Sequence, residues 1–582
     1  MRALRWTVVS LLIVGASSSV IPGQVADPRQ QMLEVYATEQ GGRPEVEIRG
    51  SEAGVASVSP LATLAGSRIL MAGGNAVDAA VAVGAALNVT GGGSNQIGGD
   101  TVMMIYLAQT GEFVSIDAYS KVPANPKLKE MLEALPGVKG NPDAYREEPR
   151  SATPGQPGPR SNGVLVAMVP GTAAAWTRAI EKFGTKPLSE VLAPAIEYAD
   201  KGFPIENSVA GAIRGAAPVM MKYPSSAKIF YPNGKPLQAG EILVQKDLAN
   251  TFRKIAAGGF DAFYKGEIAK AIVDYVQAHG GVITMEDMAN YDVALRKPYM
   301  GTYRGYDIVA APPPTSGIHV LQQLNIVENF DLAKMGYHSA DALHVMIEAT
   351  KLAGADRRGI SGDPDFLKMP ITGLISKKYA AQRTKLIDLN KAGDKYPVGD
   401  PGIHESQDTT HFVVIDKWGN MVSCTTTLGS GFGSKEVIEG TGILLQDRTW
   451  WMALEGSPNS VVPGHRANIG HSPMMILKDK KPFMAIGSPG ADTIRQTVFQ
   501  GIVNVIDFGM NIQQAIEAPR FTADPLKNDV RIEPRIAAEV LAELERRGHK
   551  LTRTASWGGP GNLEGFVIDP KTGARMMGYD PR

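Results

Sequence analysis

The feature that most constrains the fold of this chain is a β-prone run that begins directly after a threonine pair. Thr409 and Thr410 precede residues 411–415, which read His-Phe-Val-Val-Ile. Aromatic and β-branched side chains in succession favour a strand, and in isolation a threonine pair in this position is an ordinary strand start. The position also permits chemistry, because a cut before Thr409 would leave a threonine with a free α-amine.

Such a threonine is a candidate nucleophile. The α-amine, directly or through a water, can act as the general base for the hydroxyl of the same residue. Before cleavage, the Thr409 hydroxyl can attack the carbonyl carbon of Asp408, and water then hydrolyses the resulting ester and releases the amine. Residues 388–407 are polar and contain glycine and proline, which break regular structure. The sequence therefore predicts a loop directly upstream of the bond that self-cleavage would cut.

Composition and charge indicate a globular protein with a small partner. Of the 582 residues, 43% are hydrophobic and 20% charged, as in ordinary globular chains. Lysine plus arginine equals aspartate plus glutamate at 59 each, so no overall field attracts nucleic acid or an anionic membrane. We therefore expect a small-molecule amide or peptide substrate, and no nucleic-acid partner.

The N-terminal residues predict export. Arg2 and Arg5 precede an apolar run at 6–14, and small residues follow at 15–19. This pattern is typical of a secretory signal peptide, here assigned to residues 1–26, which places the protein in the periplasm or outside the cell. The run is too short for a membrane-spanning helix, so no stable membrane insertion is expected, although an uncleaved anchor is the alternative. Residues 27–50 are polar and unpatterned and are expected to form a mobile leader.

The rest of the chain alternates helical and strand-like patterns. An alanine-rich segment at 77–89 and an amphipathic one at 268–279 predict helices, and residues 102–107 and 112–118 predict a hairpin. Further helices are expected at 317–328, 339–357, 493–508 and 534–547, and further strands at 422–428, 474–478 and 483–487. In the helix at 339–357, we expect the charged residues Glu348, Lys351, Asp356 and Arg357 on a solvated face or in packing contacts.

Several function classes are disfavoured. The glycine cluster at 91–93 lacks the spacing and the lysine of a phosphate-binding loop. The nine histidines show no metal-ligand spacing, so neither a metal nor another cofactor is expected. Cys424 is the only cysteine, which excludes an intramolecular disulfide, and it is expected to pack as a small apolar residue rather than act as a nucleophile.

Several short segments occur in the order and spacing of one known family. The segments are 73–80, 169–172, 312–317, 362–366, 408–411 and 487–490. Over residues 54–580 the chain resembles the γ-glutamyltransferase family, or glutathione hydrolases, of the N-terminal-nucleophile hydrolase superfamily. The resemblance implies an α+β fold with four αββα layers. It also implies a precursor that is cut into a large fragment, 27–408, and a small fragment, 409–582.

The resemblance assigns roles to four residues. Thr409 matches the nucleophile, and Thr427 matches the threonine that hydrogen-bonds it. Gly490 and Ala491 match the pair whose backbone N–H groups form the oxyanion hole. The family usually has glycine at the second position, but alanine keeps the N–H, and such a donor typically contributes ~3 kcal/mol of transition-state stabilisation.

The positions that should bind a γ-glutamyl group differ from the family pattern. The family's arginine corresponds to Tyr119, its asparagine to Gly429, its acid to Trp451, and its serine pair to Ile469 and Gly470. The charged contacts to the substrate's α-carboxylate and α-amine are therefore missing. Burying those charges unpaired costs several kcal/mol each, so this pocket should reject an ordinary γ-glutamyl group.

Three interpretations follow. The first is a self-processed threonine amidohydrolase or acyltransferase that accepts an acyl group without the α-amino acid head, such as a glutaryl group. The second is a genuine γ-glutamyltransferase acting on glutathione, which a small insertion that moves Asp447 into the acid position would favour. The third is an exported binding protein without catalysis. Arg448, Arg466 and His471 lie near the altered positions in sequence and could restore a carboxylate contact.

Overall fold

Two antiparallel sheets form the centre of the computed structural model, which describes residues 28–40, 48–135, 162–397, 409–468, 470–524 and 527–582. The six-stranded sheet has the order β2 (Gly54–Ser57), β10 (Thr410–Ile415), β11 (Met421–Thr427), β3 (Asp100–Leu107), β4 (Glu112–Ala118) and β7 (Ala294–Arg296). The seven-stranded sheet has the order β1 (Ile48–Gly50), β20 (Arg575–Gly578), β19 (Glu564–Ile568), β15 (Lys481–Gly487), β14 (Met474–Lys478), β9 (Tyr306–Ala310) and β8 (Tyr299–Tyr303).

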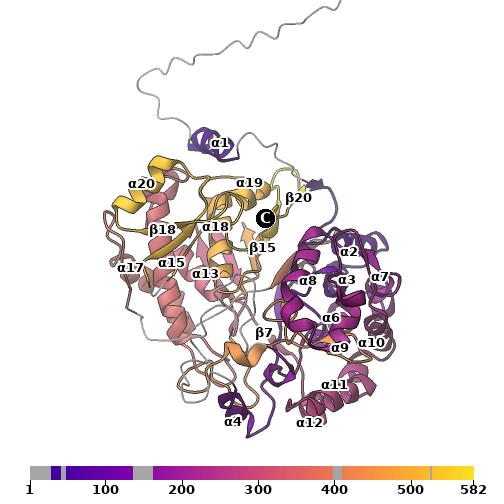
Figure 1. Cartoon of the computed structure of the whole chain (residues 1–582). Helices are drawn as coiled ribbons and strands as arrows, with labels where there is room; N and C mark the ends of the chain where they lie inside the picture. Colours follow the sequence, from indigo (N-terminus) through magenta and orange to yellow (C-terminus); the bar gives the residue numbers. More distant parts are fainter. Residues whose placement is uncertain (1–27, 41–47, 136–161, 398–408, 469, 525–526) are drawn as a thin grey trace, which may run out of the picture.

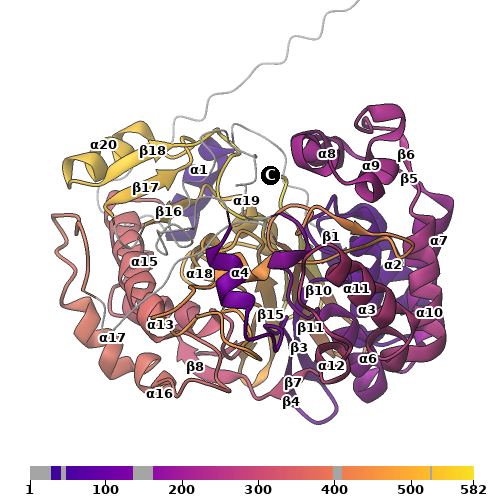
Figure 2. The ribbon, with the colours of Figure 1, turned by 60° about the horizontal axis from the view of Figure 1, so that its bottom comes forward.

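The predicted strand after Thr409 is confirmed, and it is central. β10 pairs with β11 through a hairpin in which Gly419 has φ 88°, a backbone angle that glycine adopts without strain. All residues of both strands are buried, which explains the absence of a polar alternation in their sequences. Figure 2 shows β10, β11 and β3 between helices on either side.

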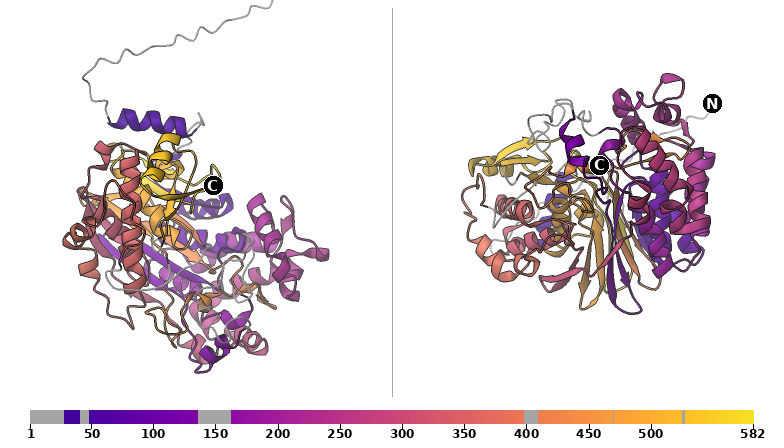
Figure 3. Two further views of the ribbon diagram at one scale, coloured as in Figure 1. Left: turned by 60° about the vertical axis from the view of Figure 1, so that its left-hand side comes forward. Right: turned by 90° about the horizontal axis from the view of Figure 1, so that it is seen from below.

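Helices cover the outer face of each sheet, so the predicted α+β fold with four αββα layers is confirmed (Figures 1 and 3). The helices on the side of the six-stranded sheet are α2 (Pro60–Met71), α3 (Ala76–Thr90), α6 (Thr172–Phe183), α7 (Leu188–Lys201), α10 (Lys246–Tyr264) and α11 (Glu267–Ala278). Those on the side of the seven-stranded sheet are α13 (Gly317–Val327), α15 (Ala340–Ile360), α17 (Lys377–Thr384), α18 (Thr493–Ile506), α19 (Ile512–Glu517) and α20 (Ala538–Arg546).

Smaller elements complete the described part. They are the helices α4 (Leu128–Glu133), α8 (Asn207–Met220), α9 (Pro224–Phe230), α12 (Met285–Ala289), α14 (Leu332–Met335) and α16 (Ile371–Leu374), and the strands β5 (Phe203–Pro204), β6 (Ile242–Leu243), β12 (Val437–Ile438), β13 (Ile443–Leu444), β16 (Phe521–Ala523), β17 (Asp529–Ile532) and β18 (Lys550–Arg553). None of the described helices is long and apolar enough to cross a membrane.

An apolar layer joins the two sheets. Val413 and Met104 of the six-stranded sheet pack in one buried cluster with Met475, Ala485 and Phe566 of the seven-stranded sheet. Side chains alternate between the two faces of a strand, so every second residue of β10 points into this layer and the others point toward the helices. The alternation decides which end residues of these strands face the space between the sheets.

The leader expected at residues 27–50 is partly wrong. Residues 28–39 form helix α1 (Pro28–Glu39), in which Met32 and Tyr36 are buried in the core beside the seven-stranded sheet. The Tyr337 hydroxyl donates a hydrogen bond of 2.8 Å to Glu39. Met32 and Tyr36, which lie four positions apart, thus anchor a segment whose sequence is mostly polar. The predicted signal peptide at 1–26 lies outside the described residues.

The solvated face expected on the helix at 339–357 is also wrong. Glu348, Lys351, Asp356 and Arg357 of α15 are all buried. Lys351 Nζ donates to Glu348 Oε1 at 2.8 Å and to Asn528 Oδ1 at 2.8 Å. Sequence reasoning failed here because other segments of the chain, among them those at Gly393 and Asn528, enclose the polar side of α15 as well.

We predict that Lys351→Met destabilises the protein strongly. The substitution leaves the Glu348 carboxylate buried without its cation, which typically costs about 3–5 kcal/mol. Lys201→Met, at a side chain that is 74% exposed, is the matched control and should change stability by less than about 0.5 kcal/mol. Chemical denaturation measures both, and equal effects of the two variants would contradict the buried ion pair.

Candidate active site

Four residues lie in one row at the end of the six-stranded sheet. The register pairs Thr427 of β11 with Asp100 of β3. Thr409 directly precedes β10, and Tyr119 directly follows β4, so the pairing of Thr410 with Thr426 and of Thr101 with Ala118 brings them into the same row. We call Thr409, Thr427, Asp100 and Tyr119 the edge row.

The edge row faces the space between the sheets. Its neighbours one residue along, Thr101 and Thr426, point the other way, because the Thr101 hydroxyl meets both Thr426 Oγ1 and Thr172 Oγ1 of α6 at 3.0 Å. Successive residues of a strand alternate between faces, so the edge row lies on the side opposite α6. Strand register thus aligns residues from two hairpins that are far apart in the sequence.

The structure brings the predicted nucleophile and its partner together. Thr409 Oγ1 lies 3.5 Å from Thr427 Oγ1, and both residues are buried. Thr427 Oγ1 in turn accepts a hydrogen bond of 2.9 Å from the backbone N–H of Gly429. The hydroxyl of Thr427 is therefore fixed by the turn that follows β11. This hydroxyl contacts the Thr409 side chain at the end of the sheet. Asp408 lies outside the described residues.

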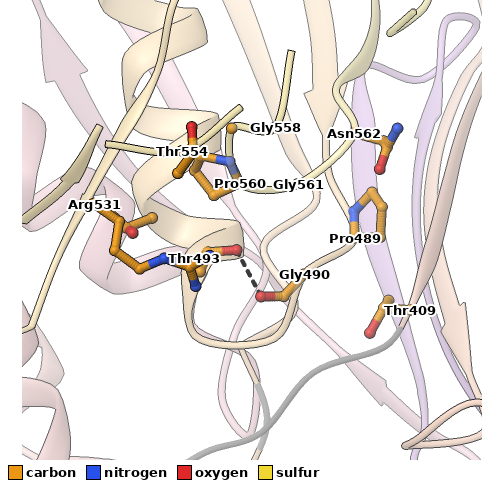
Figure 4. Close-up of a pocket in the computed structure, with 12 residues that line it drawn as sticks. Thr409, Pro489, Gly490, Thr493, Arg531, Thr554, Gly558, Pro560, Gly561 and Asn562 are labelled. Carbon is orange, nitrogen blue, oxygen red and sulfur yellow. Dashed lines mark hydrogen bonds between the residues drawn. The ribbon is translucent and has the colours of Figure 1, made fainter. Parts of the chain in front are cut away.

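The predicted oxyanion-hole pair forms the loop between β15 and α18. Gly490 has φ 120° and Ala491 has φ 54°, so both adopt backbone angles that favour glycine. Thr493 Oγ1 donates to the Gly490 carbonyl at 2.6 Å, which fixes the loop at the start of α18 (Figure 4). A side chain at position 470 would collide with the Ala491 carbonyl, so this loop geometry requires the glycine found there.

A cavity of about 260 Å³ opens beside Thr409 and Gly490. Figure 4 shows Arg531 of β17 on one side and Thr409 on the other, with the loop at 558–561 between these two residues. Sequence reasoning identified Thr409 and Gly490 but missed Arg531, Thr554 and the loop. The run Gly-Gly-Pro-Gly at 558–561 was the available signal, because such a run indicates a backbone that approaches other groups closely.

At the end of the edge row opposite Thr409, Tyr119 and its neighbour Arg448 are completely buried. The Tyr119 hydroxyl lies 2.8 Å from His471 Nδ1. Arg448 Nε forms an ion pair with Asp100, and its guanidinium carbon lies 4.9 Å from the ring centre of Trp451. Burial and the charge of Arg448 lower the pKa of His471 well below its usual value, so His471 is neutral.

Gly429, Asp447 and Trp451 also meet near the edge row. Asp447 Oδ1 accepts hydrogen bonds from the Ser430 N–H at 3.0 Å and from Trp451 Nε1 at 3.4 Å. Asp447 fills the space beside Gly429, since a Cβ at 429 would collide with its carboxylate. Both candidates for the acid position, Trp451 and Asp447, therefore lie at the same spot. Ile469 lies outside the described residues.

Arg466 and Cys424, which the sequence singled out, and the buried His411 have contacts of their own. Arg466 pairs with Asp365 at 2.7 Å, which is a structural contact near the surface. Cys424 points into the core toward the helices, and burial raises the pKa of its thiol. Burial lowers the pKa of His411 to about 3, so this imidazole, 2.9 Å from Thr425 Oγ1, carries no charge at neutral pH.

One buried group of potential metal ligands occurs among the described residues. Ligand atoms of His344, Glu348 and His549 lie within 4.8 Å of one another. Lys351 already neutralises Glu348, and His344 Nδ1 and His549 Nε2 form a hydrogen bond of 2.8 Å. These contacts explain the group as part of the buried network on α15, far from the edge row in sequence.

Two sheets packed between helical layers, with a threonine at the start of a central strand, define the architecture of the N-terminal-nucleophile hydrolases. A family profile described as Gamma-glutamyltranspeptidase matches residues 62–582. The chain belongs to the gamma-glutamyltranspeptidase family, and it is therefore an enzyme of the hydrolase and acyltransferase class. Family membership argues against the interpretation as a binding protein without catalysis.

Similar proteins include both glutathione hydrolases and acylases. The chain is 37% identical to the glutathione hydrolase proenzyme of Escherichia coli, over 100% of this chain and 97% of the relative. It is 40% identical to the acylase ACY 1 proenzyme of a Pseudomonas species, over 89% and 91% of the two chains. The crystal structure of a cephalosporin acylase from Bacillus halodurans matches with a TM-score of 0.83 and 31% identity, over 93% and 96% of the two chains.

We predict that Ala491→Gly preserves activity and does not lower stability. Both residues keep the backbone N–H, and glycine removes the strain of a positive φ, which costs an L-residue about 1–2 kcal/mol. Ala491→Val should instead lose about 1–2 kcal/mol or more, because a β-branched side chain is strained further there. Denaturation curves of the two variants test this, and a glycine variant less stable than the valine variant would contradict the loop geometry.

Proposed function

We propose that this chain is a precursor that cuts itself between Asp408 and Thr409. The products would be the large fragment 27–408 and the small fragment 409–582, which remain together as one enzyme. The observation that carries the proposal is that Thr409 directly precedes a central strand, contacts Thr427 through its hydroxyl and lines a cavity. We also propose that residues 1–26 direct export to the periplasm or the exterior.

In the mature enzyme, Thr409 supplies both nucleophile and base. Its hydroxyl attacks the amide carbonyl carbon, and its α-amine takes the proton. The backbone N–H groups of Gly490 and Ala491 stabilise the oxyanion. The proton passes to the leaving amine as the C–N bond breaks, which leaves an acyl ester on Thr409. Water or an acceptor amine then attacks that ester and releases the acyl group.

The proposed acyl group lacks the α-amino acid head of a γ-glutamyl substrate. Tyr119 stands where the α-carboxylate of a γ-glutamyl substrate would need a cation, and the Tyr119 hydroxyl contacts His471. Gly429 offers no side-chain amide, and Trp451 donates to Asp447 rather than accepting from a substrate amine. The similarity to acylases supports the same conclusion. An amide of a glutaryl-type acid therefore fits this pocket better than glutathione.

Glutathione hydrolysis is the second candidate function. Asp447 supports it, because its carboxylate lies where the family has an asparagine side chain and could approach a substrate amine. The similarity to the Escherichia coli glutathione hydrolase supports it as well. Against it, Ser430 and Trp451 already donate to Asp447, so an ammonium group would have to compete for a carboxylate with satisfied hydrogen bonds.

Self-processing is tested by N-terminal sequencing of the purified protein. We expect two fragments, the smaller beginning at Thr409. Thr409→Ala should remain a single chain, because the methyl group cannot attack the carbonyl of Asp408. Thr410→Ala is the matched control, since it lies next in the chain but faces away from the edge row, and it should still be cut. A wild-type protein that stays uncut after long incubation would overturn the proposal.

The substrate class is tested with glutaryl-p-nitroanilide and γ-glutamyl-p-nitroanilide. We expect kcat/KM for the glutaryl compound to exceed that for the γ-glutamyl compound by at least about 100-fold, because an unpaired buried ammonium costs several kcal/mol. Equal or reversed values would favour the second candidate function.

A further inference from the structure

We infer that the acyl pocket runs along the edge row and that Arg448, assisted by His471, binds a carboxylate at the far end of the acyl group. The inference rests on the proposed amidohydrolase function and deepens it. It names the substrate class as amides of dicarboxylic acids of about five carbons, held by the carboxylate that is not part of the amide. Three features support this assignment, which are donors without partners, the distance from Thr409 and nearby carboxylates that are already engaged.

Arg448 has donors that nothing in the described residues satisfies. Its Nε pairs with Asp100, but Nη1 and Nη2 are buried and have no hydrogen-bond partner within the described ranges. A buried charged donor without a partner costs more than an ordinary lost hydrogen bond, and such groups in folded proteins indicate a missing ligand or water. The two terminal nitrogens of a guanidinium match the two oxygens of a carboxylate.

His471 offers a third donor near the same place. The Tyr119 hydroxyl lies 2.8 Å from His471 Nδ1, and in the tautomer in which this hydroxyl donates, the ring proton is on Nε2. His471 Nε2 is also buried and without a partner among the residues that the structure describes. Arg448 pairs with Asp100, which lies beside Tyr119 in the edge row, and Tyr119 contacts His471, so the three side chains are close. Tyr119 therefore orients His471 rather than binding the acyl group itself.

The distance from Thr409 fits a short dicarboxylic acid. Neighbouring strands lie ~4.8 Å apart, so Asp100, with Arg448 bound to it, is about 10 Å from Thr409 along the row. An extended glutaryl chain spans about 5 Å between its two carboxyl carbons, and with an attack distance of ~3 Å and a hydrogen bond of ~2.8 Å the total is about 11 Å. A butyryl chain ends one carbon earlier and has no group that would satisfy Arg448.

The two carboxylates described beside the edge row, Asp100 and Asp447, are poor acceptors for an α-amine. Asp100 is engaged by Arg448 and by Ser120, whose N–H donates at 2.6 Å. Asp447 accepts from Ser430 and Trp451. Both nearby carboxylates are thus occupied, while three donors of Arg448 and His471 are unoccupied. This imbalance favours an added anion over an added zwitterion.

The test compares mature wild-type enzyme with Arg448→Lys and with the double variant Asp100→Asn/Arg448→Met, which removes both charges of the buried pair. Substrates are the p-nitroanilides of glutaric, butyric and γ-glutamic acids. We expect both variants to lower the ratio of kcat/KM for the glutaryl compound to that for the butyryl compound by about 100-fold, mainly through KM for the glutaryl compound. Arg383→Lys, at a buried arginine paired with Asp356 at 3.0 Å, is the control and should not change this ratio.

The outcomes separate the two proposals. If wild type prefers the glutaryl compound but the variants keep that preference, the assignment of Arg448 is wrong and the proposed function stands. If wild type prefers the γ-glutamyl compound, the proposed function fails. Should a variant not fold or process, inhibition of wild type decides, because glutarate should inhibit at concentrations at least about tenfold below those of butyrate. Equal inhibition by the two acids would overturn the carboxylate site.

Discussion

The register of three neighbouring strands is the constraint on which the candidate active site depends. β10, β11 and β3 are antiparallel and buried on both faces, so a shift of one residue would turn every side chain to the wrong layer. The actual register places Thr409, Thr427 and Asp100 side by side on the inner face. Helix packing on one side and the second sheet on the other thus fix the position of the proposed nucleophile.

Buried polar pairs at the end of this sheet determine which ligands the proposed pocket can bind. Asp100 and Arg448 neutralise each other, and Asp447 is satisfied by Ser430 and Trp451. Such pairs contribute little net stability, because removing two charges from water costs about as much as their attraction returns. These pairs instead affect which charged groups of a ligand can bind beside them. A carboxylate with all its hydrogen bonds made is a poor acceptor for a ligand, whereas a guanidinium with unmet donors is a good site for an anion.

Local patterns predicted the regular elements well, because helix and strand periodicity are properties of short segments. The hairpin at 102–118, the alanine-rich helix at 77–89 and the strand after Thr409 all occur near the expected positions. Prediction failed where burial came from remote segments. The charged residues of α15 are enclosed by the chain around residues 393 and 528, and Arg531 reaches the cavity only because β17 packs beside the loop at 558–561.

The sequence by itself determined the family, the α+β class and the identity of the threonine proposed to act, since these follow from short motifs and local periodicity. The tertiary structure alone decided that Arg448 pairs with Asp100 and that Tyr119 meets His471. Tyr119, Asp100 and Thr427 come from three strands, and Arg448 and His471 from two loops, so their proximity depends on strand register and loop packing. The physical reason is that side chains from different segments form the pocket together. The local sequence pattern around one of these side chains does not indicate which residue it will contact, or which hydrogen bonds will remain unsatisfied.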